Sequence, residues 1–197
     1  AIAYRYQNGR LTSIFERDYT EIAIADLDSN GTTDLCLLTP QAQSTLLFLA
    51  CSTDSGFETV DSLTLPHGIV SFDSILAGRT ANGQTALFLD STVDLYDTSF
   101  QITDVISARR REDGSPALVN LLDNENLSLS KLTLRPMQNL FCRDIDNDSI
   151  IEIPTASTLP GYEDMLDEDA LYLTTYNILT PNVQLTPEHS GVINTQH

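Results

Sequence analysis

The stretch IADLDSNGTTDLCLL, residues 24–38, places acidic and small polar residues at alternate positions, interrupts them with Gly31 and continues into an apolar run. Alternating oxygen-bearing side chains around a sharp turn can converge on one centre, as a hard cation such as calcium requires. The apolar residues on both sides have the length and pattern of short β-strands. This stretch therefore predicts a cation-binding loop between two strands.

Calcium takes about six to eight oxygen ligands, and magnesium fits this loop less well because it demands a stricter octahedron. The predicted ligands are the side chains of Asp26, Asp28, Asn30 and Asp34 and the carbonyl of Thr32. Gly31 permits the sharp turn. The alternative is an Asx-rich β-turn in which the same side chains cap the backbone without a metal.

An EF-hand begins in a similar way, but it needs a bidentate acid at the twelfth position of its loop and a helix on each side. Counting from Asp26, that position is Leu37; counting from Asp144, it is Thr155. Both stretches also continue into strand-like sequence. We therefore exclude an EF-hand.

Three weaker copies of the opening stretch follow along the chain. The four units lie near residues 22–38, 75–89, 106–120 and 141–155. Only the fourth restores the acids, with Ser149 in place of the glycine. Its predicted ligands are the side chains of Asp144, Asp146, Asp148 and Glu152 and the carbonyl of Ile150.

The second and third units lack this set of oxygens. At the corresponding positions stand Gly78, Thr80, Asn82 and Ala86 in the second unit, and Arg109, Arg111, Asp113 and Ala117 in the third. An arginine cannot bind a cation, and its guanidinium can instead neutralise nearby acids. We therefore expect two calcium sites rather than four, each with a structural role.

The chain as a whole is strand-like. Short apolar runs alternate with clusters of Gly, Pro, Asn, Asp and Ser about every eight to twelve residues. The first unit predicts strands at 21–25, 34–39, 45–51 and 57–65, the opening segment predicts two strands around an Asn8-Gly9 turn, and 170–179 predicts a third strand for the last unit. We expect one all-β domain over residues 1–197, with each unit forming one sheet of three to four strands.

The segment DLDSNGTTDL, residues 26–35, flanked by apolar strands and repeated in degenerate form, resembles the FG-GAP or VCBS-type repeat. Such repeats build the β-propeller heads of integrin α-subunits and of many bacterial surface and secreted proteins. The resemblance implies a β-propeller-like array of about four short blades, calcium in some loops, and an extracellular or cell-surface location. The resemblance also implies about seven blades, more than the four to five units of this chain, so we expect a fragment of a larger propeller or an irregular array.

The charge of the chain limits its partners. The 28 Asp and Glu against 10 Lys and Arg give a net charge of −18, which repels nucleic acid and anionic lipid. No apolar stretch approaches the length of a membrane span. We expect a protein or glycan ligand, and self-association through exposed edge strands.

Three cysteines are too few for a disulfide scaffold. Cys36 and Cys51 can face one another if a hairpin is centred near Ala42–Gln43, which permits a bridge; the alternative is buried free thiols. Cys142 stays unpaired in either case.

No sequence motif for catalysis is present: there is no HExxH, GxSxG, phosphate loop or CxxC. His67, His189 and His197 are scattered, and we interpret the first as a turn residue. The basic 108–113 and acidic 163–169 segments are interpreted as solvated loops. The resemblance favours a non-enzymatic binding, adhesion or structural module of a bacterial surface protein or lipoprotein. The alternative is an accessory or catalytic domain of a carbohydrate-active hydrolase, which a buried pair of carboxylates away from both acidic loops would favour.

Overall fold

The computed structural model describes residues 2–95, 97–122, 134–136, 140–157, 170–179 and 184–194. Every regular element in these ranges is a β-strand, and every pairing between named strands is antiparallel. The prediction of an all-β chain is confirmed. The acidic 163–169 segment, which the sequence analysis interprets as a solvated loop, lies outside the described residues.

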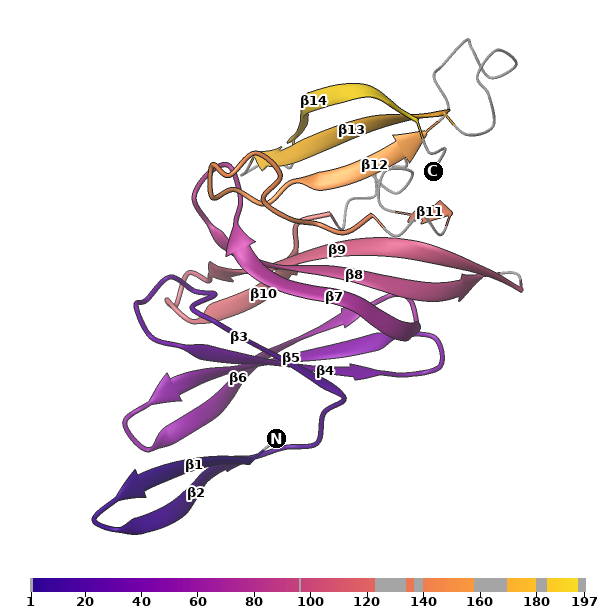
Figure 1. The fold of residues 1–197 in the computed structure, drawn as a ribbon. Helices are drawn as coiled ribbons and strands as arrows, with labels where there is room; N and C mark the ends of the chain where they lie inside the picture. Colours follow the sequence, from indigo (N-terminus) through magenta and orange to yellow (C-terminus); the bar gives the residue numbers. More distant parts are fainter. Residues whose placement is uncertain are drawn as a thin grey trace.

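The strands form four sheets (Figure 1). The first is the hairpin of β1 (Ile2–Gln7) and β2 (Arg10–Glu16), which turns at Asn8-Gly9 as predicted. The second contains β3 (Glu21–Ala25), β4 (Asp34–Pro40), β5 (Thr45–Thr53) and β6 (Gly56–Leu65). The third contains β7 (Ile69–Arg79), β8 (Thr85–Leu95), β9 (Thr98–Arg110) and β10 (Pro116–Asn120), with β11 (Leu134–Pro136) also paired to β9. The fourth contains β12 (Ile153–Ser157), β13 (Ala170–Leu179) and β14 (Gln184–Asn194).

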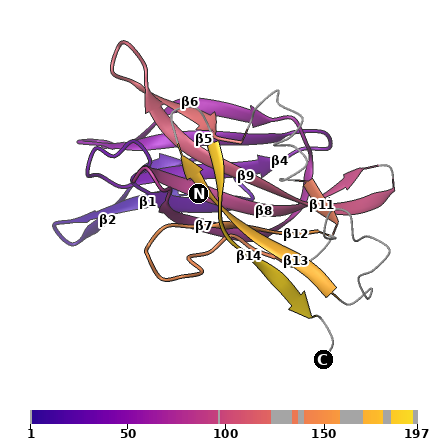
Figure 2. The same ribbon diagram turned by 90° about the horizontal axis from the view of Figure 1, so that it is seen from above.

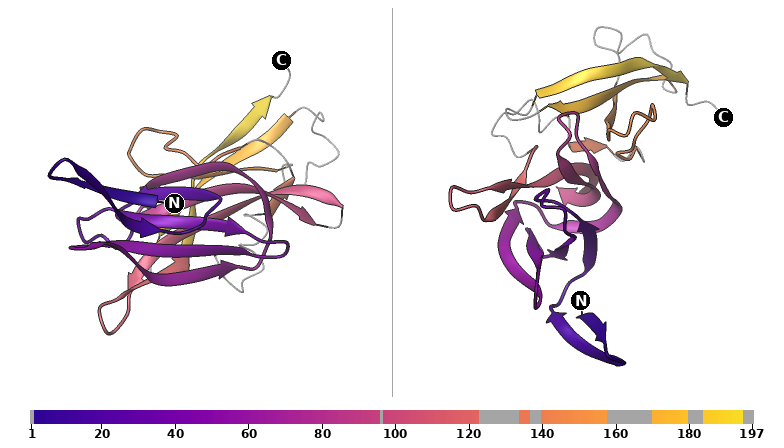
Figure 3. Two further views of the ribbon diagram at one scale, coloured as in Figure 1. Left: turned by 90° about the horizontal axis from the view of Figure 1, so that it is seen from below. Right: turned by 90° about the vertical axis from the view of Figure 1, so that its left-hand side faces the viewer.

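The sheets follow one another in chain order. The β1–β2 hairpin lies at one end and the β12–β14 sheet at the other (Figure 1; Figure 3, right), and the second and third sheets overlie one another when seen from above (Figure 2). Apart from β11, which pairs with β9 and not with β10, each sheet is a meander in which neighbours in sequence are neighbours in space. The described strands do not close into a ring.

The expectation of one sheet for each sequence unit is wrong for the middle of the chain. The second unit, 75–89, is the β7–β8 hairpin, and the third, 106–120, is the β9–β10 hairpin of the same sheet. The two units look like separate repeats because both contain the same kind of tight turn.

Two apolar layers hold the sheets together, and β8 is buried on both faces. Leu87 and Leu89 belong to the larger layer, between the second and third sheets, whereas Ala86 and Phe88 belong to a smaller layer with Ile151 and other residues near β12. Since successive residues of a strand point to opposite faces, this double burial explains the continuous apolar run at 86–89.

The three cysteines are buried free thiols. The hairpin is centred at Ala42–Gln43, but its register places Leu49, and not Cys51, opposite Cys36. Burial raises the pKa of both Cys36 and Cys51 to about 12. The cross-strand bridge is therefore not formed, and the free-thiol alternative is confirmed.

Candidate metal loops

The first and fourth units form two loops of the same construction. We call residues 26–34 the first acid loop, which joins β3 to β4, and residues 144–152 the second acid loop, which leads into β12. Each loop begins just after a residue that pairs with the loop's closing acid: Ala25 pairs with Asp34, and Arg143 with Glu152. A shift of 118 residues superimposes one pattern on the other.

The leading aspartate of each loop caps the turn. Asp26 Oδ1 accepts a hydrogen bond from Asn30 N at 3.0 Å and Oδ2 accepts one from Gly31 N at 2.9 Å. In the second acid loop Asp144 accepts from Asp148 N at 3.1 Å and from Ser149 N at 3.0 Å. These bonds are those of the Asx-turn alternative, and they fix the positions of the oxygens whether or not a cation is bound.

The middle residues repeat the same scheme. Asp28 Oδ1 accepts from Asn30 N at 3.1 Å, and Asp146 Oδ1 accepts from Asp148 N at the same distance. Ser29 and Asn147 both have positive φ, at 56° and 66°. Gly31 and Ser149 do too, at 85° and 73°, so Ser149 adopts the left-handed conformation for which glycine is suited.

A buried acid closes each loop. Asp34 and Glu152 have no exposed surface, and each accepts a backbone N–H from its own loop: Leu27 N to Asp34 Oδ2 at 3.0 Å, and Ile145 N to Glu152 Oε2 at 2.6 Å. Oδ1 of Asp34 is buried and accepts no hydrogen bond from an N–H or O–H group of the described residues, and the thiol of Cys51 is a weak hydrogen-bond partner of the same carboxyl group. Burial is the main cause that raises the pKa of Asp34 above its usual value, and the charge of Asp28 adds to it.

Three carboxylates meet in each loop. Asp26, Asp28 and Asp34 each offer an oxygen within 4.8 Å of the others, and so do Asp144, Asp146 and Glu152. These acidic clusters could hold a metal ion. Hard oxygen donors of this kind suit calcium or magnesium rather than softer transition metals, so the donor set fits the predicted ion.

The remaining predicted ligands take part in the turns. Asn30 Oδ1 accepts from Thr32 N at 2.7 Å, and its Nδ2 donates to Asp28 Oδ2 at 3.0 Å. Asp148 Oδ1 accepts from Ile150 N at 2.7 Å, and it does not belong to the three-carboxylate group. Ile150 also pairs with Arg79 of β7. Metal binding by Asn30, Thr32, Asp148 and Ile150 stays a prediction.

The middle units form closed turns instead. Thr80 N donates to Gln84 O at 3.0 Å and Gly83 N to Thr80 O at 2.8 Å; Arg111 N donates to Ser115 O at 2.8 Å and Gly114 N to Arg111 O at 2.9 Å. We call 80–84 and 111–115 the tight turns. The Arg111 guanidinium lies 2.5 Å from Asp61 of β6, so the prediction that it neutralises a nearby acid is confirmed.

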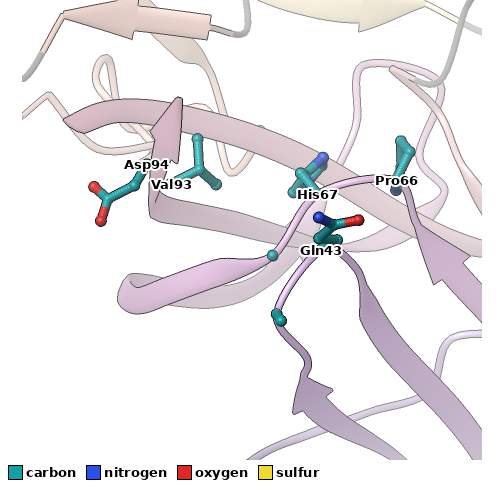
Figure 4. Close-up of a pocket in the computed structure, with 7 residues that line it drawn as sticks. Gln43, Pro66, His67, Val93 and Asp94 are labelled. Atoms are coloured by element: carbon teal, nitrogen blue, oxygen red, sulfur yellow. The ribbon is translucent and has the colours of Figure 1, made fainter. Parts of the chain in front are cut away.

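A second polar site, which the sequence did not reveal, lies between the second and third sheets. A cavity of about 510 Å³ is lined by Ala42, Gln43, Pro66, His67, Gly68, Val93 and Asp94 (Figure 4). His67 Nε2 lies 2.8 Å from Oδ2 of the buried Asp104, whose Oδ1 accepts from Asn120 Nδ2 at 2.7 Å. His67 thus joins the β6–β7 connection to β9, beyond the role of a turn residue; its only sequence signal was the turn LPHG.

The buried acids outside the two loops do not form a pair in the part of the chain that the structure describes. These are Asp90 and Asp104. Asp104 lies opposite Leu89 and Asp90 opposite Thr103, so the two carboxyl groups project from opposite faces of the third sheet. Asp90 accepts hydrogen bonds from Thr103 Oγ1 and Cys142 N, both at 2.6 Å, which anchors the segment before the second acid loop.

No protein-family model matches the chain, and no curated protein matches its sequence. Within the described ranges, no helix is long and apolar enough to cross a membrane.

Proposed function

We propose that this chain is a calcium-stabilised, non-enzymatic segment of a propeller-type binding, adhesion or structural module, of the FG-GAP or VCBS kind, from an extracellular or cell-surface bacterial protein. The observation that carries the calcium proposal is the group of three carboxylates in the first acid loop, where the buried Oδ1 of Asp34 accepts no hydrogen bond from an N–H or O–H group of the described residues. A buried carboxylate oxygen without an N–H or O–H donor is costly, and a bound cation would offset that cost.

The repetition of the loop supports the same proposal. Three carboxylates within 4.8 Å repel one another, and two loops 118 residues apart hold their acids with the same backbone bonds. A bound cation turns that repulsion into attraction and fixes the connection between strands. In this proposal the loops therefore have a structural role: a bound cation fixes the connection between the strands on either side of each loop.

The binding role rests on the fold and on the resemblance of the loops, because a fold does not by itself determine a function. A protein or glycan ligand agrees with the strong negative charge, which disfavours nucleic acid and anionic lipid. The hydrolase alternative has no support from Asp90 and Asp104, which project from opposite faces of one sheet.

The experiment is equilibrium unfolding of the metal-free chain, in chelator and with added calcium. Binding to the folded state alone adds about 2.7 kcal/mol per site at about 100 times the dissociation constant. Asp34→Asn and Glu152→Gln should each abolish one increment, and the double variant should lose both. Both substitutions keep an oxygen that can accept the loop N–H, so the loop can still form.

The matched control is Asn82→Ala in a tight turn, which should lower stability equally with and without calcium. A parent chain whose unfolding ignores calcium after exhaustive metal removal would contradict the proposal, and the acid loops would then be Asx turns only.

A further inference from the structure

The apolar layer between the second and third sheets becomes polar at one end. Leu87 and Leu89 of β8 belong to this layer, and Ser91 follows them on the same face of the strand. Ser91 is buried, and its Oγ has no hydrogen-bond partner among the described residues. The buried Thr45 of β5 donates to the carbonyl of His67 at 3.1 Å. Polar groups at core positions cost stability and are typical of functional sites.

The buried Asp104 determines which nitrogen of the His67 ring carries the proton. Its Oδ2 lies 2.8 Å from His67 Nε2, and its Oδ1 accepts from Asn120 Nδ2 at 2.7 Å. Because a carboxylate only accepts hydrogen bonds, Nε2 donates, and Nδ1 of the neutral ring is left as an acceptor. In the doubly protonated ring the charge is balanced by that of Asp104. The pair therefore brings no net positive charge to the cavity that His67 lines.

The cavity of about 510 Å³ has an acidic and apolar lining. Its polar side chains include the carboxylate of Asp94 and the amide of Gln43, whereas Pro66 and Ala42 supply apolar surface, and no Lys or Arg of the described residues lines it. Asp94 Oδ1 accepts from Ser99 Oγ at 2.7 Å, which holds the carboxylate in place at one end of the labelled residues (Figure 4). The volume is in the range of small-molecule sites.

We propose that this cavity binds an organic cation, a guanidinium or primary ammonium group on an aliphatic stem. The charged group pairs with the Asp94 carboxylate, the acceptors of Gln43 and His67 take its further N–H groups, and the stem covers Pro66 and Ala42. The net charge of −18 draws cations toward the surface, and an anion would meet Asp94 with no positive group to offset it. The same chemistry is offered by an Arg or Lys side chain of a partner protein and by a free amine.

The inference rests on the binding part of the proposed function, because it names the ligand chemistry, and not on the calcium part. Its test is an NMR titration of the full chain in chelator, at neutral pH and physiological salt, that follows the side-chain resonances of His67 and Gln43. The probes are N-acetyl-arginine methylamide and its neutral isostere N-acetyl-citrulline methylamide. The arginine probe should shift both sets of resonances to saturation. The citrulline probe should bind about tenfold more weakly or less, because it cannot form the charge-assisted bond.

Variants show whether Asp94 is the partner of the cation. Asp94→Asn should weaken binding of the arginine probe by about tenfold, and Gln43→Ala should weaken it less. Glu58→Gln is the matched control, because it removes the same charge from an exposed residue near the start of β6, whereas the cavity lies beyond the end of that strand. It should leave the affinity unchanged, and circular dichroism of each variant verifies that its fold is intact.

Three results would overturn the proposal. They are equal affinities for the two probes, equal effects of Asp94→Asn and Glu58→Gln, and resonances of His67 and Gln43 that do not move. The source of the cation is assigned by titrating putrescine and a peptide with one central arginine in the same way: tighter binding of the peptide indicates a partner protein, and tighter binding of putrescine a free amine.

The calcium part of the proposed function is tested separately on the same variants. Asp94→Asn should keep every calcium-dependent increment of unfolding stability, since Asp94 lies outside both acid loops. A chain that responds to calcium but binds no probe would contradict the cavity proposal alone. A chain that binds the arginine probe but ignores calcium would contradict the calcium proposal alone.

Discussion

The two acid loops and the two tight turns begin from similar sequences, yet they close their strands in different registers. In the acid loops the last strand pairs before the connection are Ala25–Asp34 and Arg143–Glu152, which lie six residues before and three residues after the Gly31 position. In the tight turns the last strand pairs are Arg79–Thr85 and Arg110–Pro116, which lie four residues before and two residues after the corresponding glycine. The acid loops leave eight residues outside the ladder, 26–33 in the first, and the turns leave five, 80–84 in the second unit.

The difference lies in which groups satisfy the loop backbone. In each tight turn backbone carbonyls accept two of the loop N–H groups, as with Thr80 N and Gln84 O, and one side-chain oxygen accepts a third. In the acid loops carboxylates accept them, at Asn30 N, Gly31 N and Leu27 N in the first loop. Where carboxylates accept these N–H groups in place of carbonyls, the connection between the strands is longer and several negative charges lie inside it. A cation-binding loop needs this concentration of negative charge.

The largest expected effect comes from the buried acid that closes an acid loop. Asp34→Ala should lower the free energy of unfolding by about 1–3 kcal/mol even in chelator, because the N–H of Leu27 loses its acceptor. Asp34→Asn keeps an acceptor and removes the buried charge, so it should be nearly neutral in chelator. Urea unfolding measures both.

The tight turn provides an internal comparison for this experiment, because β8 carries Ala86 where the first loop has Asp34. A strand at that position therefore accepts alanine when the turn is closed by backbone bonds. Equal costs for Asp34→Ala and Asp34→Asn would show that the N–H acceptor does not matter, and the contrast between loops and turns would fail.

A smaller effect is expected at the residue with positive φ. Ser149 has φ of 73° where the first loop has Gly31, and a side chain in this region costs about 1 kcal/mol. Ser149→Gly should therefore stabilise the chain by about 0.5–1 kcal/mol, since the added freedom of glycine in the unfolded chain offsets part of the gain. Gly31→Ala should have the opposite sign, measured by the same urea unfolding.

Gly83→Ala is the control for this pair, because Gly83 has φ of 81° in a tight turn with open space around it. It should cost as much as Gly31→Ala in chelator. If only the acid loop responds, the cost does not arise from the backbone conformation.

The strands of the first unit were predictable from sequence alone. The strand predicted at 21–25 coincides with β3, and those at 34–39 and 45–51 match β4 and most of β5, because clear turn residues separate half-buried apolar runs. The one-residue difference in register was not predictable. When Gly31 is aligned with Gly83, the two glycines share a positive φ, but the strand pairs around them are offset by one residue. The hydrogen bonds of the backbone reveal this offset, and the sequence does not.

The acid loops were recognisable because their donors are local in sequence. The role of His67 was not, because its partner Asp104 lies 37 residues further along the chain, on β9, and Asn120, which holds the other oxygen of Asp104, comes from β10. Nothing in LPHG indicates that the imidazole will reach a buried carboxylate of another sheet. The long strand β9 was also missed, since its burial on both faces mixes polar and apolar residues and leaves no period of two.

The subtlest contrast concerns two acids whose pKa values are shifted in opposite directions. Burial raises the pKa of Asp34 above 3.8, whereas hydrogen bonds from Ser115 lower the pKa of Asp113 in the tight turn. In chelator, Asp34 therefore adds stability as the pH falls through its folded pKa, because the folded protein takes up the proton first. Asp113 contributes stability above its unfolded pKa and loses it as the pH falls through the folded value. Carboxyl carbon shifts recorded against pH should give Asp34 the higher midpoint, and calcium should lower that midpoint while leaving Asp113 unchanged. If the two midpoints coincide in chelator, or if calcium shifts both, then Asp34 in the acid loop titrates no differently from Asp113 in a tight turn, and the contrast between loop and turn fails.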